Sequence, residues 1–342
     1  MNHVHLSAVP EEEQRSPGGK FHSFCRNLSL AIGGVRSTGT WGGGHPFDLQ
    51  IRRLPPGAAV CPFHQHLVQW EMFVVRSGEG TVRSGAERHV VKAGEAFLQP
   101  PGTPHQLINT ATSDLEVLIV ADNPPLDLCY YPDSNKWGGR AFGGTFRMTP
   151  TDYFAGEEEP PANAPAGNFA PPPPPQPAPI APFASRRVRL DDLPWEDWSS
   201  TKGKFGQAGR QISIPLGAKH RQPLSQGGHP FDLELGKVAP GKIACPFHFH
   251  TFQWECYLFL GGRGEFRLGD ERFAVSTDDL VMAPPGVAHT FANTGTEDLL
   301  YLLIADDPAA DYWYYPDSGK WGFSKPRKIF RATEVEYWDG EE

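Results

Sequence analysis

The chain of 342 residues consists of one unit that occurs twice. Matching residues recur at a constant offset of 184 positions, as from His64 to His248 and from Trp137 to Trp321. Such a repeat restricts the possible folds, because each copy is expected to form the same supersecondary unit. The constant offset also indicates that neither copy has gained or lost a residue relative to the other.

The repeat divides the chain into two domains and a connector. We predict an N-terminal domain over residues 1–158 and a C-terminal domain over residues 188–342, because the match covers nearly all of each copy. Residues 159–187 separate them, are rich in proline and lack apolar periodicity. Segments of this composition form extended, polyproline-like connectors, so a Pro-rich linker is expected here.

Short apolar runs and frequent turn residues favour an all-β fold. The chain has 37 Gly and 35 Pro, with 39% hydrophobic residues. Runs such as "HPFDLQIRRL" from His45 and "LEVLIVA" from Leu115 are of strand length and are bounded by Gly, Pro or Asp. Many short strands without long helical segments predict a small antiparallel barrel or sandwich in each repeat.

The charge and the cysteines exclude several classes of protein. A net charge of -9 without clustered Lys and Arg argues against a nucleic-acid partner. The N-terminus lacks the pattern of a signal peptide, and the longest apolar runs are too short for a membrane span, so no membrane partner is expected. Five scattered cysteines without a CxxC spacing favour a reducing compartment, and we predict a cytoplasmic protein.

Two histidines, one residue apart, precede Gln-Trp-Glu in both repeats. Residues 61–71 read "CPFHQHLVQWE" and residues 245–255 read "CPFHFHTFQWE". In a strand, residues i and i+2 point to the same face, so His64 and His66 are expected to project together. Glu71 has the wrong parity for one straight strand, and a turn, bulge or strand change after His66 is needed to return its carboxylate to that face.

A third histidine, His105, follows the turn sequence "PPGTP". Three imidazoles and one carboxylate suit a first-row divalent ion such as Fe, Mn, Ni, Zn or Cu. Four protein ligands leave two positions open on an octahedral ion, which permits a substrate to bind. We predict up to one ion per barrel, of unassigned identity. The candidate ligands are His64, His66, Glu71 and His105 in the first repeat, and His248, His250, Glu255 and His289 in the second.

The spacing of these residues resembles the two motifs of the cupin superfamily. The first motif corresponds to Gly57, His64, His66, Glu71 and Gly78, and the second to Gly94, Pro100, Gly102, His105 and Asn109. The resemblance implies a bicupin: two small antiparallel β-barrels of jelly-roll type, each with an ion inside and one open end for a small-molecule substrate. It also implies that the two barrels pack as an internal pseudo-dimer, with further oligomerisation left open.

Two departures from the family pattern leave the ligands intact. Six residues, rather than the common five, separate Gly57 from His64, and the same holds in the second repeat. Asp278 stands where the first repeat has Gly94. Asp tolerates turn conformations that most side chains avoid, so we expect both copies to bind metal.

Several neighbours of the ligands have two interpretations. Gln69 and Gln253 are either donors to a metal-bound ligand or strand-edge residues. Trp70 and Trp254 are expected to pack outside the barrels or between them. The histidine of the repeated "HPFDL" segment is interpreted as a turn residue, and the repeated "YYPDS" segment as a clasp that closes the barrel or joins the two barrels.

Cupins host many chemistries, so the family alone does not give the function. We favour a metal-dependent enzyme on a small molecule that chelates the ion through two oxygens, with dioxygenase-type oxidoreductase chemistry first. Glu71 and Glu255 are then candidate catalytic bases. The alternatives are a metal-dependent isomerase or lyase on a sugar-like substrate and a non-catalytic metal- or small-ligand-binding protein. Activity in one barrel or in both is left open.

Overall fold

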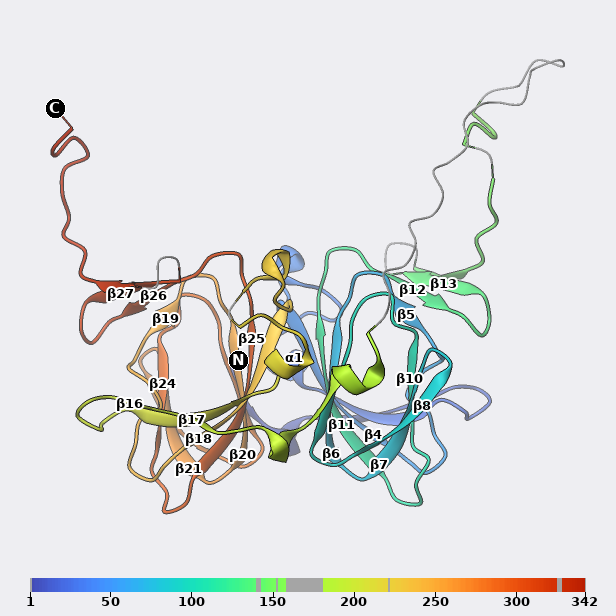
Figure 1. Ribbon diagram of the computed structural model, residues 1–342, viewed down its shortest axis with the longest axis horizontal. Coiled ribbons are helices and arrows are strands. Elements are labelled where there is room, and N and C mark those ends of the chain that lie inside the picture. The colour runs from blue at the N-terminus through green and yellow to red at the C-terminus, as the bar shows by residue number, and fades with distance from the viewer. Residues whose placement is uncertain are drawn as a thin grey trace.

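The protein is described from a computed structural model. It describes residues 2–139, 143–151, 153–157, 181–220, 222–324 and 328–341. Almost all of its regular structure is strand, arranged as two barrels side by side (Figure 1), so the prediction of an all-β protein with two antiparallel barrels is confirmed. The predicted Pro-rich linker falls, up to residue 180, outside the described residues.

The first barrel is built from three antiparallel sheets. Its largest sheet contains, in spatial order, β15 (Arg187–Arg189), β9 (Glu95–Gln99), β6 (Glu71–Ser77), β11 (Leu115–Asp122), β4 (Phe47–Leu54), β3 (His22–Asn27) and β2 (Glu11–Arg15). A second sheet contains β10 (His105–Ile108), β7 (Glu79–Ser84) and β8 (Glu87–Lys92). The third contains β14 (Gly144–Phe146), β13 (Lys136–Gly139), β12 (Leu128–Tyr131) and β5 (Gln65–His66).

The second barrel repeats this arrangement. Its largest sheet contains β1 (His3–His5), β23 (Asp279–Ala283), β20 (Glu255–Gly261), β25 (Leu299–Asp306), β18 (Phe231–Val238), β17 (Gly206–Gln211) and β16 (Glu196–Ser199). The smaller sheets contain β22 (Glu271–Ser276), β21 (Arg263–Leu268) and β24 (His289–Asn293), and β19 (Phe249–His250), β26 (Tyr312–Tyr315), β27 (Lys320–Phe323) and β28 (Lys328–Phe330).

The helices are short and connect strands. Among the described residues they are α1 (Leu28–Ala31), η1 (Leu6–Ala8), η2 (Thr40–Gly42), η4 (Phe183–Arg186), η5 (Leu190–Asp192), η6 (Ile214–Leu216) and η7 (Leu224–Gln226). Within the described ranges, no helix has the length and apolar character needed to cross a membrane.

The alternation of side chains along β4 separates two environments. Phe47, Leu49 and Ile51 are at most 2% exposed and belong to the apolar core between the barrels. The alternate residues Gln50 and Arg52 line a cavity inside the first barrel. Because successive side chains in a strand point to opposite faces, this one strand builds both the contact between the barrels and the polar interior.

The two barrels share one apolar core between their largest sheets. It combines side chains of β4, β6 and β11 with side chains of β18, β20 and β25. Each buried Leu, Val or Phe contributes roughly 1.5–3 kcal/mol relative to exposure. Beside this core, Trp70 lies 5.0 Å from His229 and Trp254 lies 5.2 Å from His45 between ring centroids. Both tryptophans therefore pack between the barrels.

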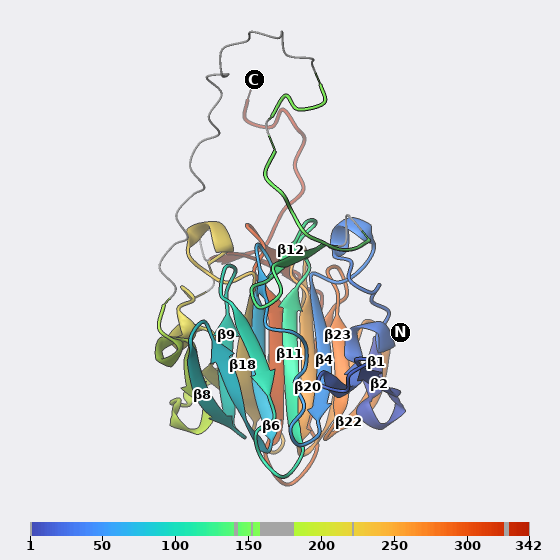
Figure 2. The same ribbon diagram turned by 90° about the vertical axis from the view of Figure 1, so that its right-hand side faces the viewer.

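The first strand of each repeat completes the sheet of the other repeat. β1 pairs antiparallel with β23, where His3 lies opposite Val281. β15 pairs with β9, where Arg187 lies opposite Phe97. The first strand of each sequence repeat therefore belongs to the sheet of the other barrel. Figure 2 shows β1 beside β23 and β9 within the first barrel.

Left-handed turns join the strands. Gly78 has a φ of 77°, and a side-chain carbon added there would lie 2.3 Å from the Asp114 carbonyl oxygen, so only glycine fits. Asp278 adopts a φ of 68° where Gly94 has 81°, as expected for an Asp in a turn. Its carboxylate also accepts a bond from Arg76 of the first barrel at 3.2 Å.

Candidate metal centre

The structure brings the four predicted ligands of the first barrel together. The backbone amides and carbonyls of His64 and His105 pair with each other at 2.7 and 3.1 Å. Strand β5 ends at His66 and β6 begins at Glu71, so the intervening residues change the direction of the chain. This break resolves the parity problem and places the Glu71 carboxylate beside the three imidazoles.

The ligand atoms face one another at short distances. Glu71 Oε2 lies 2.8 Å from His105 Nε2, 3.6 Å from His66 Nε2 and 4.0 Å from His64 Nε2. The second barrel repeats this cluster with Glu255 Oε2 2.6 Å from the corresponding Nε2 of His289. Histidine and carboxylate atoms at such spacings match the donor set of a first-row divalent ion.

Backbone carbonyls select the tautomer of two imidazoles in the first barrel. His64 Nδ1 lies 2.9 Å from the Pro62 carbonyl oxygen, and His105 Nδ1 lies 2.9 Å from that of Thr103. Since a carbonyl only accepts, Nδ1 carries the proton and Nε2 presents a lone pair in the neutral ring. In the neutral ring, the lone pair of His105 faces the Glu71 carboxylate, and two acceptors at 2.8 Å fit a cation between them. Without a cation, a proton on Nε2 donates to Glu71 instead.

An aspartate missed by the sequence analysis holds the remaining imidazole. Asp127 Oδ2 lies 2.6 Å from His66 Nδ1, and its Oδ1 accepts from the backbone N–H groups of Val68 and Gln69. Asp311 holds the corresponding histidine in the second barrel. The available signal was an aspartate repeated at the constant offset, but no motif links it to a histidine 61 residues earlier.

The two glutamines have backbone partners. The side-chain amide of Gln69 donates to the Asp122 carbonyl at 2.6 Å, and that of Gln253 donates to the Asp306 carbonyl at 2.7 Å. Among the described residues, these bonds anchor the turn before β6 and β20 rather than a ligand atom. Donation from either glutamine to a metal-bound ligand stays a prediction.

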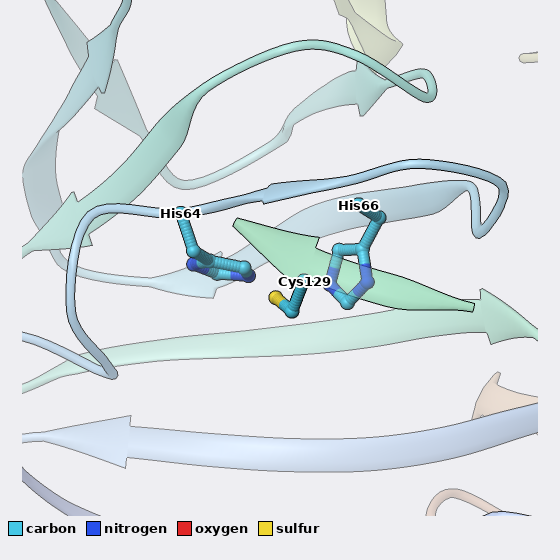
Figure 3. Close-up of side chains that lie close together, drawn as sticks. All are labelled: His64, His66 and Cys129. Atoms are coloured by element: carbon cyan, nitrogen blue, oxygen red, sulfur yellow. The ribbon is translucent and has the colours of Figure 1, made fainter. Parts of the chain in front are cut away.

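A thiol of β12 lies close to two of the imidazoles in the first barrel. Cys129 of β12 has its sulfur within 4.8 Å of imidazole nitrogens of His64 and His66. Figure 3 shows the three side chains close together. The Tyr131 ring, from the same strand, lies 6.2 Å from the His64 ring. At the position equivalent to Cys129, the second barrel has Trp313. Burial raises the pKa of Cys129 to about 12, so the thiol is protonated near neutral pH.

The electrostatics of the site favour the forms that bind a cation. Burial raises the pKa of Glu71, but His66 and His105 outweigh it and hold that pKa well below the usual range. Burial, reinforced by His105, lowers the pKa of His64 to about 3. Burial also opposes the charged form of His66, yet Glu71 and Asp127 raise its pKa overall. An ionised carboxylate and a neutral His64 are the species that coordinate metal.

A cavity of about 300 Å³ adjoins the ligands inside the first barrel. His64, Glu71 and His105 form one part of its lining, and Gln50 and Arg52 form another. Apolar residues complete the wall, and they include Phe73, Leu107 and Ile119. A small molecule can therefore reach the ligands and a cationic group within the same space.

In the second barrel, an aromatic side chain occupies the volume that corresponds to Arg52. Gly236 replaces Arg52, and a side-chain carbon there would lie 2.1 Å from Cζ of Tyr301, which is 1% exposed. The Tyr301 hydroxyl donates to Gln207 at 2.8 Å. The hydroxyl of Tyr257 donates to Glu255 at 2.7 Å. The two barrels thus share a ligand set and differ in what lies behind it.

A further hollow of about 310 Å³ lies at the second barrel, away from the candidate ligands. Lys204, Phe247 and Arg267 are among the residues that line it, and none of the eight candidate ligands is. Candidate ligands of the first barrel line the other cavity, inside that barrel.

Comparison with known proteins identifies the domain type. The family model of a cupin domain matches residues 50–121 and 234–305, once in each repeat. An oxalate-binding protein of Thermotoga maritima is 34% identical over 68 residues, which cover 20% of this chain and 55% of that protein. The chain thus matches about half the length of this curated relative.

Two solved structures share the fold over most of the chain. The oxalate decarboxylase of Lactobacillus farciminis, solved as a formate complex, is 14% identical with a TM-score of 0.54, covering 91% of this chain and 88% of that chain. The Bacillus subtilis oxalate decarboxylase, described with Mn(II) centres, is 16% identical with a TM-score of 0.53, covering 91% and 78%. At these identities the likeness concerns the fold.

Proposed function

The chain is a duplicated cupin protein, and from this premise we propose that its first barrel is the catalytic centre of a metal-dependent enzyme. The substrate is a small molecule that chelates the ion through two oxygens. The observation that carries this proposal is the cavity of about 300 Å³ that joins His64, Glu71 and His105 to polar groups in the barrel interior. Enzyme sites are typically concave and mostly apolar, with a few convergent polar groups.

The ion would be held by His64, His66, Glu71 and His105. We propose Mn²⁺ as the first ion to test, because the Bacillus subtilis relative is described with Mn(II) centres. The same donor set also suits Fe, Ni, Zn and Cu. When bound, a metal ion of this kind polarises substrate oxygens and, if redox-active, gives access to oxygen chemistry.

The residues of the chain provide position, charge and exclusion of water. Asp127 orients the His66 ring, and the ionised Glu71 supplies the anionic ligand. Phe73 and Ile119 form an apolar part of the cavity wall, which lowers the local dielectric and strengthens polar interactions with a substrate. We further propose that the Glu71 carboxylate, once it leaves the ion, is the base that accepts a substrate proton.

We propose a dioxygenase-type reaction first and a lyase-type or isomerase-type reaction second. The second class is supported by the oxalate decarboxylases, which share the fold. The two classes differ in a measurable way, because a dioxygenase consumes one O₂ per turnover and a lyase or isomerase requires no net oxygen uptake.

Metal analysis followed by a substrate screen tests the proposal. The full chain, loaded with Mn²⁺, Fe²⁺, Ni²⁺, Zn²⁺ or Cu²⁺ in turn, is offered small 2-oxo, 2-hydroxy and enediol acids with and without O₂. Turnover that His64→Ala removes supports an enzyme in the first barrel. A wild-type protein that holds no metal after reconstitution contradicts the proposal. Binding of an acid without turnover, in every metal form, supports the non-catalytic alternative.

A further inference from the structure

Three side chains of the first barrel form a second set of candidate ligands. One imidazole nitrogen from each of His64 and His66 and the sulfur of Cys129 lie within 4.8 Å of one another. In Figure 3 the sulfur lies between the two rings. Zinc binds histidine nitrogen at about 2.0 Å and sulfur at about 2.3 Å, so ligand atoms on opposite sides of one ion are about 4.3 Å apart. The three atoms can therefore hold one ion after small movements of the side chains.

Strand pairing holds the thiol beside the histidines. Cys129 on β12 lies opposite His66 on β5 in an antiparallel pair. Side chains at opposite positions of such a pair lie on the same face, with their Cβ atoms about 5 Å apart. Asp127, two residues before Cys129, holds the His66 ring through Nδ1 at 2.6 Å, which leaves Nε2 of the neutral ring for an ion. One segment of the chain thus orients the imidazole and supplies the sulfur.

The set that contains sulfur overlaps the set of nitrogen and oxygen ligands. His64, Glu71 and His105 also have ligand atoms within 4.8 Å of one another. His64 belongs to both sets, and its Nδ1 faces the Pro62 carbonyl, so the ring has one lone pair for an ion. An ion in one set therefore excludes an ion in the other. Carboxylate oxygen suits Mn²⁺, whereas thiolate sulfur selects softer ions such as Zn²⁺.

The second barrel has a tryptophan in place of this thiol. Trp313 replaces Cys129 and lies opposite His250 in the same register. Its indole nitrogen donates to the Tyr315 hydroxyl at 2.8 Å, and an indole N–H has no lone pair for a cation. The ligand set described in this barrel consists of His248, His250 and Glu255. The second barrel is therefore a comparison site in the same chain, with imidazoles and a carboxylate but without this sulfur.

A second thiol near the same histidine serves as the control. The Cys61 sulfur lies 3.4 Å from His64 Nδ1, the nitrogen that faces the Pro62 carbonyl. Nδ1 carries the proton in the neutral ring, so Cys61 lies on the side of the ring away from the lone pair. Its counterpart in the second barrel, Cys245, lies 3.7 Å from His248 Nδ1. Cys61 is therefore not expected to share an ion with His64 Nε2.

We propose that His64, His66 and Cys129 form a second ion position in the first barrel, which selects thiophilic divalent ions such as Zn²⁺ and Co²⁺. The entering ion displaces the thiol proton to solvent and forms a metal–sulfur bond, as coordinated thiols do. Because His64 is shared, the identity of the ion decides which of the two sets it occupies. The inference rests on the proposed function only in the use of His64 and His66 as ligands.

Absorption spectroscopy of the Co²⁺-loaded protein tests the proposal. The wild-type chain and His248→Ala, which confines Co²⁺ to the first barrel, are both measured with a phosphine reductant present. A cobalt–thiolate bond gives a charge-transfer band in the near ultraviolet that nitrogen and oxygen ligands do not give. We expect this band in both proteins, its loss in Cys129→Ser and its retention in Cys61→Ser. Bound Co²⁺ without the band, or a band that survives Cys129→Ser, overturns the proposal.

Metal affinities show whether Cys129→Ser acts on the sulfur position alone. Competition with a chelator, in chains that carry His248→Ala, gives the affinities of the first barrel for Zn²⁺ and Mn²⁺. We expect Cys129→Ser to weaken Zn²⁺ binding about 10- to 100-fold, at least the effect of removing a residue that supports a ligand. Mn²⁺ affinity is expected to stay the same, because Glu71 and His105 remain. An equal loss of affinity for both ions indicates a disturbed barrel and overturns the proposal.

The outcomes separate this proposal from the proposed function. A wild type that retains Mn²⁺ but binds Co²⁺ without the sulfur band overturns the role of Cys129 and leaves the proposed function intact. The sulfur band in a wild type that does not retain Mn²⁺ supports the role of Cys129 and contradicts Mn²⁺ as the ion of the proposed enzyme. Failure of the wild type to retain either ion contradicts both proposals.

Discussion

The two barrels of this protein have the same candidate ligands and different interiors. In both, three imidazoles and one carboxylate converge, and an aspartate holds the second histidine of the pair. Behind these groups, the first barrel has a cavity with Arg52, whereas the second has Tyr301 packed over Gly236. Both barrels therefore have the groups that can bind an ion, whereas the cavity that could admit a substrate is described in the first barrel.

The ligand positions are the same in the two repeats, whereas the interior positions behind them differ. The ligand histidines depend on backbone carbonyls and strand ends that recur in both repeats, such as the paired backbones of His64 with His105 and of His248 with His289. Among the described bonds, Arg52 on β4 contacts Gln14, Ser23 and Gln50 and none of the candidate ligands. Gly236 could therefore replace Arg52 without disturbing the ligands.

Substitution of one metal ligand, in the first or in the second barrel, is expected to give the largest difference in turnover between the two barrels. His64→Ala is expected to lower turnover on the order of 1000-fold, because the ion in the cavity is lost. His248→Ala is expected to lose the ion of the second barrel and retain turnover. Metal content and initial rates of both variants provide the measurement. Equal loss of turnover in the two variants contradicts a single active barrel.

Truncation of Tyr301 tests how tightly this ring packs inside the second barrel. Tyr301→Val introduces the residue that the first repeat has at Val117. The variant is expected to lose about 3 kcal/mol of unfolding free energy, because a buried ring is removed and Gln207 loses its partner. Urea denaturation measures the loss, with Val117→Ala as the control for a smaller truncation in the first barrel. A change below about 1 kcal/mol would show that the ring is not well packed.

Substitution of the aspartate that holds the second histidine is expected to weaken metal affinity equally in the two barrels. Asp127→Asn removes the anionic partner of His66, and Asp311→Asn does the same for His250. Each change is expected to weaken metal affinity about 10- to 100-fold at its own site. Competition with a chelator provides the affinities. A large effect at one site only indicates that the two clusters bind metal differently.

The histidines between the barrels are expected to give the smallest effect, a dependence of stability on pH. Burial lowers the pKa of His229 to about 4, whereas an unfolded histidine titrates near 6.5. The unfolded state therefore binds more protons below pH 6.5, and stability falls as the pH drops from about 6.5 toward 4. The contribution of His229 reaches roughly 1 kcal/mol at pH 5.5.

His229→Gln provides the measurement for this residue. Urea denaturation at pH 7.5 and pH 5.5 should show a smaller pH effect in the variant than in the wild type. His45→Gln is the matched variant in the other repeat, where burial also lowers the pKa. An identical pH effect in His229→Gln and the wild type contradicts the assignment.

The sequence predicted the fold and the candidate ligands because both depend on local patterns. Strand length, turn residues and the constant offset between repeats determine two barrels, and the cupin resemblance located His64, Glu71 and their partners. The exchange of β1 and β15 could not be predicted, because "HVH" and "RVR" have no pattern that selects one sheet edge over another. Backbone pairing depends on which edge is near, and that is a property of the packed barrels.

The residues that distinguish the barrels were also beyond prediction. In the sequence, Arg52 is an ordinary residue of a strand with an alternating pattern. Its inward direction is determined by the packing of Phe47 and Leu49 against the other barrel. Cys129 and Asp127 approach the ligands from a segment far along the chain. Such contacts depend on tertiary packing, which neither periodicity nor motif spacing describes.

The exchange of first strands has a consequence for synthesis of the protein. Strand β1 is synthesised long before its partner β23, which begins at Asp279. Strand β1 must therefore wait, unpaired, until most of the chain has been made, whereas β15 finds a completed edge at β9. A truncated chain that ends before β23 would expose the unpaired strand, and such edges promote association between chains.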